Sequence, residues 1–295
     1  MALNKQKSDD EIFQESIKFH QSGNLNNAQK GFSYLILKYP NSPDLLNSLG
    51  TINLQLGEDS KGCSFLEKSL QMNPNQPMIS FNLGNSYANQ KKFSKALKFL
   101  KMTLSNDPNY IEAYKKKGEI LTHLKIHDEA LYCFKKAIKL VPEDITILNG
   151  IGVNLLELGE AKDALEYFKK CIKINKTVAI FYNNAGLAEY KMNAFKESIE
   201  SFDKCINISP STGRFYSNRG LSYQALKKLK IAIENFNKCI SLDPDYPEAY
   251  WNKSLVNLFQ GNYEDGWKLY EYRWQSFAKG WARSYTKKLW LGEEA

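Results

Sequence analysis

Small and bulky apolar residues recur along this chain at a fixed interval of 34 positions. Within residues 111–144, Gly118 and Leu121 lie three positions apart, and Ala130 and Phe134 lie four apart. Spacings of three and four place such residues on one face of a helix. The pattern therefore predicts two amphipathic helices, joined by a short turn, in each 34-residue interval.

Four columns carry this period. The first consists of six glycines extended by two serines: Ser16, Gly50, Gly84, Gly118, Gly152, Gly186, Gly220 and Ser254. The second is small: Ala28, Gly62, Ala96, Ala130, Ala164, Ser198, Ala232 and Gly266. The third is bulky: Phe32, Leu66, Leu100, Phe134, Phe168, Phe202, Phe236 and Tyr270. The fourth is mostly proline, at Pro40, Pro74, Pro108, Pro142, Pro210 and Pro244, with Lys176 and Ala278 as exceptions. Glycine inside a helix costs roughly 1 kcal/mol relative to alanine, so its column indicates close helix packing.

These columns resemble the tetratricopeptide repeat family over about residues 9–278. The resemblance implies an all-α, right-handed superhelical solenoid of eight helix-turn-helix repeats. First helices would line a concave groove and second helices would form the convex back. The expected repeats are 9–42, 43–76, 77–110, 111–144, 145–178, 179–212, 213–246 and 247–278. Residues 1–8 are expected to be an N-terminal tail, and 279–295 a C-terminal tail or the start of a missing domain.

The net charge of +8 comes almost entirely from lysine. Many lysines fall on the expected second helices: Lys135, Lys136, Lys139, Lys169, Lys170 and Lys173. A solvated convex face accounts for them, and weak attraction to acidic partners is the functional alternative. Nucleic-acid binding is not expected, because arginine is scarce and no basic groove is evident. The chain has neither an apolar stretch of about twenty residues nor an apolar signal-peptide core, which predicts a cytoplasmic protein without membrane contact.

Cysteine and histidine give little sign of chemistry. Cys171, Cys205 and Cys239 share a column with Ala137, so they are predicted to be buried free thiols. Packed helices lie roughly 10 Å apart, which exceeds disulfide reach. His123 and His127 have the four-residue spacing of metal ligands, but two ligands do not complete a site. With no recognisable nucleotide-binding or nucleophile motif either, the chain is expected to be neither an enzyme nor a holder of a cofactor or metal.

The expected groove carries amides. Asn82, Asn184, Asn218 and Asn252 share one column on first helices. The resemblance implies that asparagines here form a ladder that hydrogen-bonds the backbone of an extended peptide, since an amide both donates and accepts. The candidate peptide-binding residues are Phe81, Asn82, Asn183, Asn184, Tyr190, Asn218, Trp251 and Asn252. The structural alternative is that these asparagines cap or bond a neighbouring helix. Lys115 matches one position of a carboxylate clamp found in some family members, but Glu119 replaces an expected asparagine, so the clamp is not predicted.

The C-terminal end gathers the tryptophans: Trp251, Trp267, Trp274, Trp281 and Trp290. A cap over the last repeat is the simplest interpretation. The string GNYEDGWKLYEYRW, with LWLGEE further on, also resembles the junction in bacterial proteins that join such repeats to a glycosyltransferase domain.

Two functions follow. The first is a protein–protein interaction scaffold that binds a peptide or protein segment in its concave groove. The second is the recognition or assembly arm of a bacterial glycosyltransferase, or another transferase, whose catalytic domain is not in this chain. Self-association as a homo-oligomer is a third, weaker hypothesis.

Overall fold

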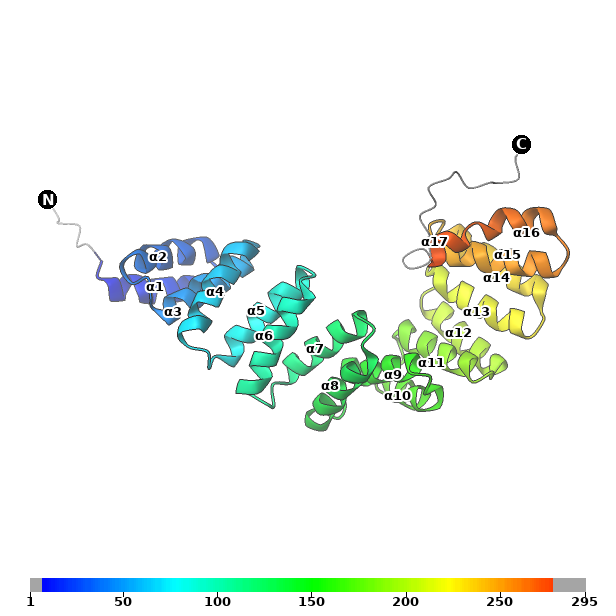
Figure 1. Cartoon of the computed structure of the whole chain (residues 1–295), viewed down its shortest axis with the longest axis horizontal. Coiled ribbons are helices and arrows are strands. Elements are labelled where there is room, and N and C mark those ends of the chain that lie inside the picture. The colour runs from blue at the N-terminus through cyan, green and yellow to red at the C-terminus, as the bar shows by residue number, and fades with distance from the viewer. Residues whose placement is uncertain (1–6, 278–295) are drawn as a thin grey trace, which may run out of the picture. The chain divides into compact units, whose positions relative to one another are not determined.

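The computed structural model describes residues 7–277, and these fold as consecutive helix-turn-helix pairs with no strand in that range (Figure 1). This confirms the predicted all-α repeat fold. The helices are α1 (Asp9–Gln21), α2 (Leu25–Lys38), α3 (Pro43–Gln55), α4 (Asp59–Met72), α5 (Pro77–Asn89), α6 (Phe93–Asn106), α7 (Ile111–His123), α8 (His127–Leu140), α9 (Ile145–Glu157), α10 (Ala161–Ile174), α11 (Ala179–Lys191), α12 (Phe195–Ile208), α13 (Gly213–Ala225), α14 (Leu229–Leu242), α15 (Pro247–Phe259), α16 (Tyr263–Tyr270) and α17 (Arg273–Phe277).

Packing divides the chain into two compact units, residues 1–150 and 151–295. In the N-terminal unit, α3 packs on α4 and α5 on α6, while the first helices α3, α5 and α7 also contact one another in sequence. The C-terminal unit repeats this order, with α11 on α12, α13 on α14, and contacts from α11 to α13 and from α13 to α15. Each unit thus presents a row of neighbouring first helices.

The glycine column allows the two helices of a hairpin to approach. A Cβ atom added to Gly152 would lie 2.5 Å from the Phe168 ring, and one added to Gly220 would lie 2.6 Å from the Phe236 ring. Real Cβ atoms essentially never come so close, so glycine is required. Both rings are fully buried. The close helix packing that the glycine column indicated is confirmed.

The bulky column also links neighbouring hairpins. The Phe134 ring lies where a Cβ atom on Gly118, in its own hairpin, would come within 2.8 Å. A Cβ atom on Gly150, in the next hairpin, would come within 2.7 Å of the same ring. Phe134 therefore fills the space between the two hairpins.

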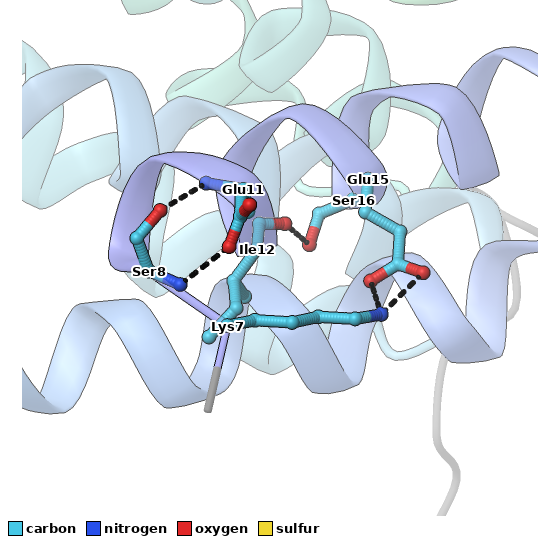
Figure 2. Close-up of polar contacts among 6 residues, drawn as sticks. All are labelled: Lys7, Ser8, Glu11, Ile12, Glu15 and Ser16. Atoms are coloured by element: carbon cyan, nitrogen blue, oxygen red, sulfur yellow. Dashed lines mark hydrogen bonds and ion pairs between the residues drawn. The ribbon is translucent and has the colours of Figure 1, made fainter. Parts of the chain in front are cut away.

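The first helix has a fully formed N-terminal cap (Figure 2). The Ser8 hydroxyl accepts a hydrogen bond from the Glu11 amide at 3.2 Å, and the Glu11 carboxylate accepts one from the Ser8 amide at 2.8 Å. This capping box satisfies two backbone donors that the helix start leaves unpaired. Ser16, which replaces glycine in this hairpin, donates to the Ile12 carbonyl at 2.7 Å, and Lys7 pairs with Glu15.

The turn within each hairpin uses left-handed backbone at one fixed position. Four of these positions hold glycine: Gly23, Gly57, Gly159 and Gly261. The other four hold Lys91, Lys125, Asn193 and Lys227, at φ of 58° to 61°. A side chain other than glycine costs about 1–2 kcal/mol in this conformation. The turn geometry is therefore retained even where the residue does not favour it.

All five cysteines are buried free thiols, which confirms the prediction for Cys171, Cys205 and Cys239. Burial raises the pKa of the Cys171 thiol to about 11, and the pKa values of Cys205 and Cys239 to about 12. The second-helix lysines are exposed, as expected. Within residues 7–277, no helix combines the length and the apolar character needed to span a membrane.

Candidate functional site

A polar hollow lies on the first helices of the N-terminal unit. It has a volume of about 320 Å³ and lies between α3 and α5, with the start of α4 at its edge. Its lining is Thr51, Leu54, Gln55, Asp59, Asn82, Asn85, Ser86 and Asn89. Among the described residues, the side chains of Asn82, Asn85 and Asn89 have no hydrogen-bond partner. These amides are therefore available to a ligand.

An apolar hollow lies on the first helices of the C-terminal unit. It has a volume of about 230 Å³ and lies between α13 and α15, with the start of α14 at its edge. Its lining is Gln224, Ala225, Lys227, Leu229, Leu255, Val256 and Phe259. Phe259 is 74% exposed, and Leu255 is half-buried. This hollow offers apolar surface to solvent and few hydrogen-bonding groups.

The two hollows occupy the same place in the repeat, five intervals of 34 residues apart. The equivalent pairs are Leu54 and Gln224, Gln55 and Ala225, Asp59 and Leu229, Asn85 and Leu255, Ser86 and Val256, and Asn89 and Phe259. The fold therefore makes the same hollow twice, and the sequence lines one with amides and the other with apolar side chains.

The difference extends along the row of first helices. The position that follows the glycine column holds Ile17, Thr51, Asn85 and Glu119 in the N-terminal unit, and Val153, Leu187, Leu221 and Leu255 in the C-terminal unit, so it is polar in three of the four N-terminal repeats and apolar in every C-terminal one. The apolar members are all half-buried, so each leaves part of its surface open to solvent. The rims differ in charge as well: Glu58 and Asp59 flank the polar hollow, whereas Lys227 and Lys228 flank the apolar one.

Of the candidates predicted in the N-terminal unit, Asn82 lines the polar hollow directly. Phe81, its neighbour, packs its ring against Tyr110 with the centroids 5.0 Å apart. Asn82 thus lines a hollow on the first helices, while Phe81 contributes to packing between hairpins. Ligand contact by either residue remains a prediction.

The candidates in the C-terminal unit largely contact one another. The Asn218 amide donates to Asn183 Oδ1 at 2.8 Å, and the Asn183 amide donates to Asn184 Oδ1 at 3.2 Å. This network joins α13 to α11, which is the neighbouring-helix role that the sequence left open. Asn183, Asn184 and Asn252 are buried. Trp251 is half-buried, and Tyr190 is too, with its ring 5.5 Å from that of Phe195.

Sequence reasoning missed the residues that shape the hollows most. Asn85 and Leu255 follow the glycine column directly, and Asn89 and Phe259 end their helices. The signal was present in the sequence. Gln21, Gln55, Asn89, His123, Glu157, Lys191 and Ala225 hold the positions equivalent to Phe259, so an aromatic residue there is a departure from the rest of the chain.

Two lysines on α7 form ion pairs. Lys115 binds Asp144 at 2.7 Å, and Lys116 binds Glu119 at 2.9 Å. His123 packs on the Phe93 ring at 5.0 Å between centroids. Over the described part of the chain, no group of three or more potential metal ligands comes together.

The repeat columns and hairpins agree with a known family. Tetratricopeptide repeat profiles match residues 80–110, 145–177, 179–212 and 213–246. The chain belongs to the tetratricopeptide repeat family. A comparison with curated proteins finds no match. The repeat columns outside the matched ranges follow the same period.

Solved tetratricopeptide repeat structures share the fold. A protein from Parabacteroides merdae is 20% identical, with 84% of this chain and 98% of that one covered at a TM-score of 0.59. Part of a repeat protein from Cytophaga hutchinsonii is 16% identical, with 81% and 98% covered at 0.64. YrrB, described as having an unusual peptide-binding site, is 22% identical, with 62% and 95% covered at 0.53. At these identities the likeness concerns the fold alone.

The predicted glycosyltransferase junction is not supported by these matches. Trp281, Trp290 and the C-terminal tail 279–295 lie outside the described residues, as do residues 1–6 of the N-terminal tail. Trp267 and Trp274 are described and exposed.

Proposed function

We propose that this tetratricopeptide repeat protein is an interaction scaffold whose first helices bind an extended segment of a partner protein. The observation that carries this proposal is the set of side-chain amides without partners on α5. Asn82, Asn85 and Asn89 project into one hollow beside Thr51 and Gln55. Amides supply a donor and an acceptor, so they can bond a peptide backbone irrespective of its side chains. The peptide-binding site of YrrB, a protein of the same fold, agrees with this use of the fold.

The predicted residues of the C-terminal unit differ in how accessible they are to a ligand. The asparagines of the C-terminal unit are less accessible, because Asn184 and Asn252 are each less than a tenth exposed. Tyr190 and Trp251 are half-buried and retain surface that a ligand could contact. The proposal therefore places backbone recognition first on the N-terminal unit.

A selection experiment tests the function. A displayed library of random twelve-residue peptides is selected on the whole chain, and the Kd of an enriched peptide is measured for the chain and for a variant with Asn82, Asn85 and Asn89 all changed to Ala. The variant should bind about 10-fold or more weakly, since each net hydrogen bond contributes about 0.5–1.5 kcal/mol. Asn207→Ala with Asn237→Ala, exposed amides on second helices, is the matched control and should bind as the original chain does.

The alternative function has one observation in its favour. Trp267 occupies the column of Leu131, Leu165 and Ile233, which are buried or half-buried in their hairpins, yet Trp267 is 59% exposed. Such an apolar face fits a following domain, including the catalytic domain of a transferase. The coding sequence beyond Ala295 is the test: an open frame into such a domain supports the alternative, and an immediate stop codon removes it.

A further inference from the structure

The apolar hollow between α13 and α15 has the size of one side chain. Its volume of about 230 Å³ lies below the roughly 300–1,000 Å³ of sites that enclose a whole small molecule. We propose that it binds one bulky apolar side chain of a partner protein, carried next to an acidic residue. This inference rests on the proposed scaffold function. That function does not say what binds at this hollow, and the inference adds the chemistry of the partner there.

Phe259 is the first argument for an apolar occupant. It ends α15, where it is 74% exposed and lines the hollow. The equivalent residues of the other repeats are polar, except for Ala225. Packing of the repeat therefore does not require an aromatic side chain at this position. Phe259 lies beside Leu229 and Leu255 in the lining of the hollow, and a contiguous apolar surface of this kind, unlike a single exposed residue, is typical of a binding surface.

Gln224 is the second argument. Its Oε1 atom is buried and has no hydrogen-bond partner among the described residues. The residue lines the hollow beside Leu255. The terminal torsion of glutamine is soft, so a small turn of this amide presents the oxygen to a donor. A backbone N–H next to the bound side chain supplies that donor and satisfies the buried acceptor.

Charge is the third argument, and it gives the partner its acidic residue. Lys227 lines the hollow, and Lys228 follows it on the exposed turn before α14. Neither ammonium forms an ion pair within residues 7–277. At the equivalent rim of the polar hollow, Glu58 binds Lys61 at 2.8 Å. A carboxylate that flanks the apolar side chain is complementary to the lysine rim and not to the acidic one.

The test uses the random twelve-residue library on three proteins. These are the original chain, a variant with Leu255→Asn and Phe259→Asn, and the reciprocal variant with Asn85→Leu and Asn89→Phe. Each double substitution copies the residues of the equivalent hollow. From the original chain we expect peptides in which Phe, Leu or Trp adjoins Asp or Glu. Their Kd should rise about 10- to 100-fold on the first variant, the range that corresponds to burial of one large apolar side chain. The reciprocal variant leaves the apolar hollow intact. Its overall affinity should fall with the loss of Asn85 and Asn89, but replacing the apolar residue of the peptide by Ala should still weaken binding as much as it does on the original chain.

Further outcomes are equally decisive. Phe259→Asn alone, at an exposed position, keeps the test valid if the double variant melts early, and it should still weaken binding several-fold. Enriched peptides whose affinity ignores Leu255 and Phe259 but falls with Asn85 would overturn the inference and leave the scaffold function intact. A library with no enriched peptide would instead remove the scaffold function, and the inference with it. Binding that needs the apolar residue but not its acidic neighbour would overturn the role of Lys227.

Discussion

The two units of this chain share one framework and differ in what they show to a partner. In both, a glycine on the first helix faces a bulky side chain on the second: Gly84 faces Leu100, and Gly220 faces Phe236. One position later the chemistry diverges, with Asn85 in the N-terminal unit and Leu221 in the C-terminal unit. The glycine position is constrained by its contact with the second helix, whereas the position after it is not. Surface chemistry can therefore change between repeats without a change of fold.

Overpacking the framework should have the largest effect. Gly220→Leu forces a side chain into the space held by the Phe236 ring, whose nearest atom would lie 2.6 Å from the new Cβ. We expect a loss of about 3 kcal/mol in the free energy of unfolding, at the upper end for overpacked cores. Urea denaturation followed by circular dichroism measures it. The matched Gly84→Ala should cost less than Gly220→Ala, because its Cβ would lie 3.0 Å from the flexible Leu100 side chain. Equal costs would contradict the account based on the facing side chain.

Alkaline pH should destabilise the C-terminal unit more than the N-terminal unit. Cys171, Cys205 and Cys239 all lie in the C-terminal unit, and their folded pKa values of about 11 to 12 exceed the usual unfolded value of about 8.5. As pH rises, the thiols of the unfolded state lose their protons before those of the folded state. The contribution of the buried thiols to the free energy of unfolding is therefore fully present below pH 8.5 and is lost as pH rises toward 11 or 12. The slope is about 1.4 kcal/mol per pH unit for each thiol. Hydrogen exchange between pH 8 and 10.5 should show the C-terminal unit weakening first.

The repeat itself offers the control for that experiment. Ala137 holds the same column position in the N-terminal unit, so a variant with all three cysteines changed to Ala carries a residue the fold already accepts. Its C-terminal unit should lose the excess sensitivity to alkali. An unchanged pH profile would mean that other groups, not the thiols, determine it.

The turns give a smaller and opposite effect. Lys125 adopts φ of 61°, whereas the equivalent Gly159 adopts 87° without a side-chain penalty. Lys125→Gly should raise the free energy of unfolding by about 1 kcal/mol, because it removes a left-handed side-chain conformation. Thermal unfolding monitors this change. The reverse substitution, Gly159→Lys, should lower stability by a similar amount, and a loss on Lys125→Gly would show that the lysine side chain contributes more than its backbone costs.

Salt concentration should have the smallest effect. It should change peptide binding at the lysine rim of the C-terminal unit and not at the acidic rim of the N-terminal unit. For a peptide that carries an acidic residue, Lys227→Ser should weaken binding to the C-terminal unit by about 0.5 kcal/mol, as expected for an exposed charge pair. Raising the salt concentration should remove most of the difference between the two proteins, which calorimetric titration can follow. Asp59→Ser at the other rim should leave that peptide unaffected.

The sequence predicted the framework better than the surface. Columns such as Gly118 and Phe134 are read from spacing alone, since the same contact recurs in each hairpin. The asparagine column was predicted correctly as a first-helix feature, but spacing does not tell whether an amide turns toward solvent or toward another amide. Asn218 bonds Asn183 on the neighbouring helix, which depends on side-chain torsions. Asn85 and Leu255 were readable from their column, yet their role emerges only where two helices enclose a hollow.

Phe134 has a consequence for how the N-terminal unit melts. Its ring is held against Gly118 in one hairpin and Gly150 in the next, so neither hairpin can open without removing part of the other's core. In a linear array, such shared groups act as coupling terms between nearest neighbours, and they determine how far local opening spreads. Where the shared group is a phenylalanine, adjacent hairpins should unfold together.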